Sequence, residues 1–246
     1  MTVLSKTNTL VIVPAYNEQD SIVSVIEDIK ATGFPFVVID DGSTDDTRNR
    51  AIATGARTIS LPFNAGVGGA LKCGFQYAVG KGFHAVIQCD ADNQHPVSQF
   101  NDLLVAANAS NAKIVIGSRF ISEFQIMKIN KSRRFAMRIL AFIATRATKN
   151  KITDATSGFR IISQPLLREF AETFPTYYLG DTFEALVVAG RANYQVSEIG
   201  AQLKDRTIGI STAKTNEALS MIVKTLLVTL FWTHFKITKA PDGLNK

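Results

Sequence analysis

Short apolar runs rich in β-branched residues alternate with amphipathic stretches through the first half of this chain, and that alternation constrains its fold most strongly. Five runs are predicted to be strands, at residues 9–13, 36–39, 58–61, 85–89 and 114–117. Helices should fill the gaps: Asp20 or Ser21 can cap the first and Gly33 end it, and Asp45 and Gly55 bracket the second. The pattern predicts an α/β fold, a mostly parallel sheet with helices on both faces.

The regular alternation stops after residue 117. Five further elements follow from local periodicity and composition: a basic helix at 127–148, an extended segment at 157–162, two helices at 165–173 and 181–190, and a strand at 194–199. The chain has no internal repeat, low-complexity tract or linker. One domain is therefore more consistent with the sequence than two.

Composition narrows the class of protein. With 46% hydrophobic and 20% charged residues, the 246-residue chain is too apolar to be disordered. The first apolar run, residues 10–13, is too short for a signal peptide, so we expect a cytoplasmic location. Cys73 and Cys89 stand among apolar neighbours outside any CxxC or Cys/His cluster, which predicts reduced core thiols.

The formal net charge of +6 is concentrated in one segment. Residues 124–153 contain eight Lys or Arg and no Asp or Glu, leaving 19 basic and 21 acidic residues elsewhere. Such a segment suits phosphates, an anionic membrane surface or nucleic acid. It could also be a solvated helix face, because Arg134 and Arg138 have i,i+4 spacing. Nucleic acid is disfavoured as a partner because no recognition motif is present.

Polar clusters follow three of the predicted strands. They are Pro-Ala-Tyr-Asn-Glu at 14–18, Asp-Asp-Gly-Ser-Thr-Asp-Asp-Thr at 40–47, and Asp-Ala-Asp-Asn-Gln-His-Pro at 90–96. A doubly wound sheet brings the carboxyl ends of its strands to one edge, where ligands bind. We therefore expect one anionic, metal-binding cleft built from all three clusters.

The third cluster has the chemistry of a metal site. Asp90 and Asp92 offer the oxygen ligands that Mg²⁺ or Mn²⁺ prefers, and Gln94 can supply a third. A divalent cation would neutralise the charge that develops on a nucleoside diphosphate leaving group. Alone, two aspartates after a strand are equally consistent with a helix cap.

The second cluster and a glycine-rich loop suit a nucleotide. Asp40 and Asp41 can accept hydrogen bonds from a base or ribose, although a tight turn and helix cap would explain them too. Gly66 lies in the loop 64–70, which either shapes the nucleotide site or packs a helix. The loop matches neither a Rossmann fingerprint nor a P-loop.

Five ordered motifs together resemble the family 2 glycosyltransferases, and within them the dolichyl-phosphate mannose synthase-like branch. They are the three clusters above, Gly-Ser-Arg at 117–119, and Thr-Ser-Gly-Phe-Arg at 156–160. The resemblance covers about residues 8 to 215. It implies a GT-A fold and an inverting, metal-dependent transfer from a UDP- or GDP-linked sugar to a polyprenyl phosphate or other lipid-linked acceptor.

The motifs and the resemblance supply candidate residues for each role. The nucleotide-binding candidates are Pro14, Tyr16, Glu18, Asp40, Asp41, Gly66, Asp90 and Ala91. The metal-binding candidates are Asp90, Asp92 and Gln94. The candidates for contact with an acceptor or phosphate are Arg133, Ser157, Arg160, Arg206 and Ser211. The catalytic candidates are Asp92, Arg119, Asp181, Glu184 and Arg206.

Two of these assignments carry alternatives. The segment from Arg206 to Ser211 resembles the branch's Arg-x-x-Gly-x-Ser, but Thr212 stands where the branch has Lys. A lipid phosphate needs no general base, whereas a sugar hydroxyl would need a carboxylate. Asp181 and Glu184 are the candidates for that base, or else simple charges near a helix start.

The carboxyl-terminal segment is predicted to be an amphipathic helix and tail at residues 216–246. Lys224 leaves eleven uncharged residues, 225–235, about half of what a bilayer span requires. The helix should lie in a membrane interface, or else pack on the core, a second copy or a membrane-anchored partner subunit. The resemblance divides the remaining domain, 1–215, into a nucleotide-sugar half, 1–118, and an acceptor half, 119–215.

These features leave several functions open. We expect a peripheral enzyme at the cytoplasmic face of the membrane with a lipid-linked acceptor. A saccharide or soluble acceptor and a catalytically silent nucleotide-sugar binding module are the alternatives.

Overall fold

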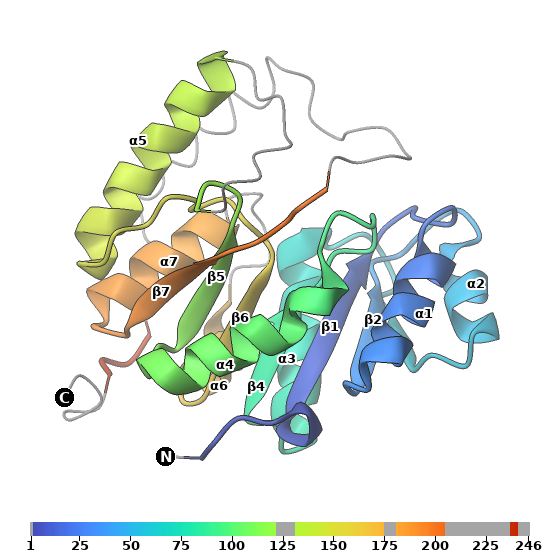
Figure 1. Cartoon of the computed structure of the whole chain (residues 1–246). Coiled ribbons are helices and arrows are strands. Elements are labelled where there is room, and N and C mark those ends of the chain that lie inside the picture. The colour runs from blue at the N-terminus through green and yellow to red at the C-terminus, as the bar shows by residue number, and fades with distance from the viewer. Residues whose placement is uncertain (1, 122–130, 175–180, 205–236, 241–246) are drawn as a thin grey trace.

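One seven-stranded mixed sheet forms the centre of the molecule (Figure 1). The computed structural model describes residues 2–121, 131–174, 181–204 and 237–240, without the side chains of 131–133 and 181. Its strands are β1 Thr9–Ala15, β2 Phe36–Asp40, β3 Thr58–Ser60, β4 Ala85–Gln88, β5 Ile114–Ser118, β6 Arg160–Ser163 and β7 Val196–Gly200. Their order in the sheet is β3-β2-β1-β4-β6-β5-β7.

Helices cover both faces of the sheet, as the alternation predicts. They are α1 Ile22–Thr32, α2 Thr47–Ala53, α3 Gly66–Gly80, α4 Phe100–Ser110, α5 Lys131–Thr148, α6 Leu166–Thr173 and α7 Asp181–Arg191, with short 3-10 turns at Lys6–Asn8 and Val97–Gln99. Buried residues of α1, α2 and α4 pack in the core on one face. Those of α3, α5, α6 and α7 pack on the other. The expected α/β class with a mostly parallel sheet is confirmed.

The direction of β6 determines which of its residues lie at the edge of the sheet that carries the polar clusters. Strands β1 to β4 are mutually parallel, and β5 is parallel to β7. Strand β6 lies between β4 and β5 and is antiparallel to both. Its first residue, Arg160, therefore pairs with Gln88 at the end of β4, so the amino end of β6 meets the carboxyl ends of its neighbours.

The predicted ends of the elements agree closely with the structure. Gly33 ends α1 in the left-handed region, with φ of 75°, and Ser21 precedes that helix. Asp46, rather than Asp45, takes the cap position of α2, although Asp45 accepts a hydrogen bond from the Thr47 amide (3.0 Å). Both cysteines are free, as expected.

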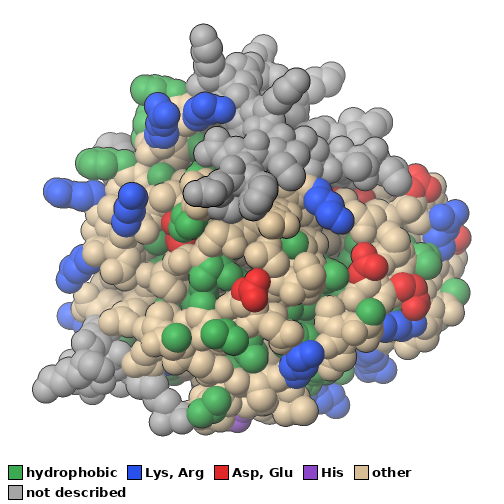
Figure 2. All heavy atoms as spheres, viewed as in Figure 1, with side chains coloured by type: hydrophobic (Ala, Val, Ile, Leu, Met, Phe, Trp, Pro, Cys, Tyr) green, Lys and Arg blue, Asp and Glu red, His purple; other side chains and the backbone are tan. Residues whose placement is uncertain are grey.

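Charged side chains are unevenly distributed over the surface. Figure 2 shows several Lys and Arg along the side of the molecule that carries α5 in Figure 1. None of the helices in the described parts of the chain is long and apolar enough to cross a membrane.

Candidate active site

The loops that follow β1 and β2 are joined by reciprocal hydrogen bonds. Asn17, in the left-handed region with φ of 54°, donates its amide to Ser43 Oγ (3.1 Å) and accepts the Thr44 amide on Oδ1 (2.9 Å). The Glu18 amide donates to Thr47 Oγ1 (2.8 Å). The first two polar clusters therefore lie side by side at the carboxyl edge of the sheet.

Asp40 and Asp41 are both buried at the end of β2 and hold different parts of this edge. Asp40 Oδ1 accepts the Ser43 amide (3.1 Å). Asp41 Oδ1 accepts the Ala65 amide (2.8 Å), and burial raises the pKa of the Asp41 carboxyl. Asp41 thus ties the second cluster to the glycine-rich loop. Contacts of either carboxylate with a nucleotide remain predictions.

The glycine-rich loop opens a long helix at the same edge. Gly66 is the first residue of α3 and has φ of 80°, a conformation that favours glycine. Its amide donates to Asn64 Oδ1 (2.9 Å). The amino end of α3, which is the positive end of the helix dipole, therefore lies next to Asp41, where it suits an anionic ligand.

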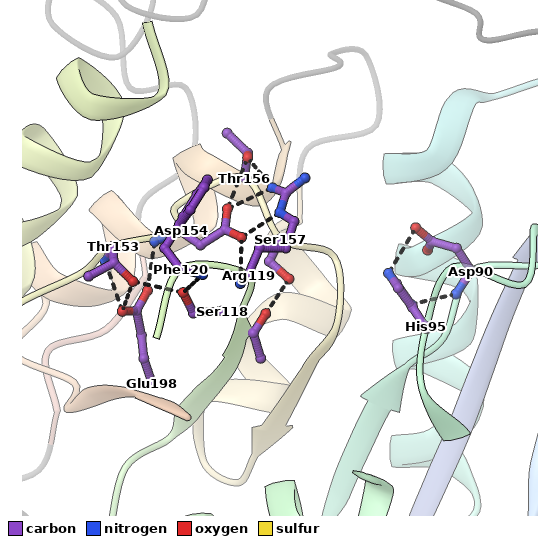
Figure 3. A network of polar contacts seen from close by, with 11 residues as sticks. Asp90, His95, Ser118, Arg119, Phe120, Thr153, Asp154, Thr156, Ser157 and Glu198 are labelled. Atoms are coloured by element: carbon purple, nitrogen blue, oxygen red, sulfur yellow. Dashed lines mark hydrogen bonds and ion pairs between the residues drawn. The ribbon is translucent and has the colours of Figure 1, made fainter. Parts of the chain in front are cut away.

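Gln88 and His95 fix the side chain and backbone of Asp90, and Figure 3 draws the contacts with His95. Its Oδ1 accepts from Gln88 Nε2 (3.1 Å), and its amide donates to His95 Nδ1 (2.9 Å). Because Nδ1 is the acceptor, the neutral His95 ring carries its proton on Nε2, which lies 3.5 Å from Asp90 Oδ2. His95 itself is buried, so it acts as a support within the third cluster.

Asp92 lies in the turn that follows. Its Oδ1 accepts the Gln94 amide (3.1 Å). Asn93, with φ of 62°, exchanges hydrogen bonds with Ser24 of α1 at 2.9 and 3.2 Å, which joins this turn to the first helix. Asp90, Asp92 and Gln94 are all partly exposed.

The oxygen atoms of this turn fit a hard divalent cation. Among the described residues, no group of three or more His, Cys, Asp or Glu is arranged to hold a metal. Two partly exposed carboxylates and an amide are nevertheless what Mg²⁺ or Mn²⁺ uses when substrate phosphates and water complete its coordination.

Arg160 lies behind Asp90 and is completely buried, with 0% of its surface exposed. Its Nε donates to Gln88 Oε1 (3.2 Å), and its Nη1 donates to the Thr182 carbonyl (3.1 Å). A chain of hydrogen bonds therefore joins Arg160 through Gln88 to Asp90. The contact of Arg160 with a phosphate remains a prediction, because in this structure its guanidinium is inside the protein.

Because Gly158 has no side chain, the side chains of Asp90 and Gln88 can occupy the space beside it. A Cβ atom at this position would lie 2.9 Å from Gln88 Nε2 and 3.2 Å from Asp90 Oδ2. The fifth motif thus contacts the third directly, although almost 70 residues separate them in the sequence.

A second network, also drawn in Figure 3, surrounds Arg119 at the end of β5. Arg119 forms a bidentate ion pair with Asp154, with Nε–Oδ2 and Nη2–Oδ1 distances of 2.6 and 2.7 Å. Its Nη2 also donates to Thr156 Oγ1 (2.7 Å). The Asp154 side chain is 0% exposed. The predicted contact of Arg119 with a diphosphate or acceptor phosphate remains a prediction.

Glu198 of β7 holds the loop that carries Asp154. Its carboxylate accepts from the amide and hydroxyl of Thr153, both at 2.8 Å, and from the Asp154 amide at 2.9 Å. Burial raises the pKa of Glu198. Ser157 donates to the Gly117 carbonyl (2.7 Å), which joins the fourth motif to the fifth.

The remaining candidates differ in their surroundings. Tyr16 is exposed, Pro14 and Glu18 are partly exposed, and Ala91 is buried at this edge. Glu184 is buried in α7. Arg206, Ser211 and the helix expected after residue 216 lie outside the described residues, as do the side chains of Arg133 and Asp181.

Several residues of these networks were not among the sequence-based candidates, among them His95, Gln88, Asp154 and Glu198. His95 lies within the third cluster, so its closeness to Asp90 in the sequence could have identified it as a site residue. Gln88, Asp154 and Glu198 act through contacts with residues distant in sequence, for which no local pattern exists.

We expect Arg119→Met to lower the free energy of unfolding by about 3–5 kcal/mol, because the buried Asp154 carboxylate would lose its counterion. The matched control is Arg50→Met, which removes a surface pair with Asp46 that should contribute about 0–1 kcal/mol. Urea unfolding followed by circular dichroism measures both. Similar small losses in the two variants would contradict a structural role for the Arg119–Asp154 pair.

Comparisons with known proteins agree with this geometry. The family model "Glycosyl transferase family 2" matches residues 10–170. A UDP-N-acetylglucosamine–dolichyl-phosphate N-acetylglucosaminyltransferase of Methanococcus voltae is 24% identical over 206 residues, 76% of this chain and 82% of that protein. A polyprenol monophosphomannose synthase of Mycolicibacterium smegmatis is 28% identical over 182 residues, 68% and 66% of the two chains.

A solved structure shares the arrangement of elements. Glucosyl-3-phosphoglycerate synthase from Mycobacterium tuberculosis, in complex with Mn²⁺, UDP and phosphoglyceric acid, superposes with a TM-score of 0.68 and 25% identity. The match covers 92% of this chain and 79% of that one. The expected GT-A fold is thereby confirmed. The family model matches well over half of this chain, so the chain belongs to glycosyl transferase family 2 and is a glycosyltransferase.

Proposed function

We propose that this enzyme transfers a sugar, with inversion, from a UDP- or GDP-linked donor to a polyprenyl phosphate or other lipid-linked acceptor, and that it needs a divalent cation. The observation that carries the proposal is the fixed Asp90 beside the partly exposed Asp92, at the edge where α3 begins. The two named relatives use dolichyl phosphate or polyprenol, which supports the acceptor class.

The donor site belongs to the half that comprises residues 1–118. Asp40, Tyr16 and the first cluster would contact the nucleoside, and the amino end of α3 would lie near the diphosphate. Asp90, Asp92 and Gln94 would hold Mg²⁺ or Mn²⁺. The bound cation supplies charge neutralisation for the departing diphosphate. The Mn²⁺ and UDP bound by the structural neighbour support this assignment.

Residues 119–215 would form the acceptor half. Here a phosphate acceptor is favoured over a sugar hydroxyl, because an anionic oxygen needs no general base. Of the two candidate bases, Glu184 is buried in α7 and 3% exposed, which is unsuited to contact with an incoming hydroxyl. Arg206, Arg133 and Ser211 are the proposed contacts of the acceptor phosphate. A soluble or saccharide acceptor is the alternative.

The outer face of α5 supports a position at the cytoplasmic face of a membrane. Phe135 and Phe142 are 66% and 65% exposed, and Arg134, Arg138 and Arg146 are exposed on the same helix. The described side chains of α5 include no Asp or Glu. Aromatic and basic side chains combined in this way suit an anionic lipid interface. The carboxyl-terminal helix would add a second contact, or else bind a partner subunit or a second copy.

Asp92→Asn should reduce transfer from a radiolabelled nucleotide sugar to polyprenyl phosphate in detergent by about 10²- to 10³-fold, because the site loses a negatively charged ligand for the cation that would stabilise the leaving group. EDTA should abolish the wild-type activity, and Mn²⁺ or Mg²⁺ should restore it. Asp102→Asn, on the exposed side of α4, is the matched control and should retain activity. EDTA-insensitive transfer, or a fully active Asp92→Asn enzyme, would contradict the metal assignment. Donor binding without transfer to any acceptor would instead indicate a silent binding module.

Gly158→Ala should lower kcat/KM by about 10- to 100-fold, because its Cβ would displace Asp90 or Gln88 and small misplacements are costly in active sites. Gly80→Ala, at the end of α3, is the control, because its Cβ would meet no atom within 4 Å. Circular dichroism verifies that both variants fold. An unchanged kcat/KM for a folded Gly158→Ala enzyme would show that the position of Asp90 is unimportant for transfer.

A Phe135→Ser/Phe142→Ser enzyme should bind anionic phosphatidylglycerol vesicles at least about 10-fold more weakly, because two exposed apolar side chains are removed from the interface. Phe63→Ser changes an equally exposed phenylalanine outside α5 and should have no effect. Co-sedimentation at low and high salt measures the binding, which salt should weaken. Equal binding of all three proteins would exclude the α5 face as the membrane contact.

A further inference from the structure

A cavity of about 650 Å³ lies at the end of the sheet opposite to Asp90. Its walls come from the connections before β4 and β5, the connection after β6, and the amino-terminal residues 2–4. His84 precedes β4, which Asp90 follows, and Lys113 precedes β5, which Arg119 follows. The length of the sheet therefore separates this cavity from the candidate active site.

The ionisable side chains that line the cavity are all basic residues. His84, Lys113 and Arg168 all contribute to the wall, and none of the described lining residues is Asp or Glu. Lys113 is only 9% exposed, and its Nζ lies 3.5 Å from Asn111 Oδ1, a long distance for a hydrogen bond. Within the described residues Lys113 takes part in no ion pair. Burial lowers the pKa of its ammonium group.

The cavity is preformed by hydrogen bonds in its walls. Asn108 accepts the Leu4 amide (2.8 Å) and donates to the Leu4 carbonyl (2.9 Å), so the amino-terminal segment is held across the end of α4. The Gln164 amide donates to the His84 carbonyl (2.9 Å), which joins the walls on β4 and β6. Val79, Phe83 and Ala112 add apolar surface.

We propose that this cavity binds a small organic anion, a phosphate or carboxylate that carries a short apolar group. A buried ammonium without a counterion is unfavourable, and an anionic ligand would supply the missing partner. The guanidinium of Arg168 at the rim offers a second, forked contact for phosphate or carboxylate oxygens. The volume lies in the range of small-molecule sites, and the apolar wall suits the remainder of the ligand.

Isothermal titration with hexyl phosphate, hexanoate, inorganic phosphate and hexanol tests the proposal, in the presence of UDP and Mn²⁺ to fill the donor site. We expect hexyl phosphate or hexanoate to bind, and inorganic phosphate and hexanol to bind at least about 10-fold more weakly, because each lacks one of the two contacts. Lys113→Met and Arg168→Met should each weaken binding by about 10-fold or more. Lys81→Met, an exposed lysine at the same end of the molecule that does not line the cavity, should leave it unchanged.

Arg168 is exposed, so its variant remains informative even if Lys113→Met does not fold. No binding of either organic anion would overturn the proposal, as would inorganic phosphate binding as tightly as hexyl phosphate. Equal affinities in wild type and both variants would assign the binding to the catalytic cleft and overturn it too. Glycosyl transfer is measured separately, so these outcomes are independent of the proposed function.

Discussion

The candidate active site depends on the hydrogen bonds that the buried guanidinium of Arg160 donates. A cation with no exposed surface requires partners inside the protein, and Gln88 and the Thr182 carbonyl provide them. Gln88 then uses its amide nitrogen to hold Asp90. The Asp90 carboxylate, which is proposed to hold the divalent cation, is thus positioned from within the sheet by side chains that the solvent does not reach.

This arrangement requires the antiparallel direction of β6. A parallel strand would place Arg160 at the opposite end of the sheet, away from Asp90. With β6 reversed, the loop before it meets the ends of both β4 and β5, so Gly158 contacts Asp90 while Asp154 pairs with Arg119. Glu198 holds the same loop from β7. The connection of residues 153–160 therefore contacts both the proposed metal-binding turn and Arg119, at the edge where transfer would occur.

The sequence predicted the strands, the covering helices and the convergence of the three polar clusters, because these follow from periodicity and from the topology of parallel sheets. It did not predict the direction of β6, since an extended pattern is the same in both directions. The motif at residues 156–160 led to Arg160 being assigned to a phosphate, whereas the structure buries it against Gln88 of a neighbouring strand and the Thr182 carbonyl. The sequence did not indicate a role for Glu198 either, because its hydrogen-bond partners are more than 40 residues away along the chain. The roles of Arg206 and the carboxyl-terminal helix remain predictions, because they lie outside the described residues.

A crystal structure with UDP and Mn²⁺, with anomalous diffraction recorded at the manganese edge, tests the account most directly. We expect one anomalous peak within bonding distance of the Asp90 or Asp92 carboxylate and of the UDP diphosphate, with Arg160 still buried against Gln88. A peak remote from both carboxylates, or UDP bound away from the carboxyl edge of β1, β2 and β4, would contradict it.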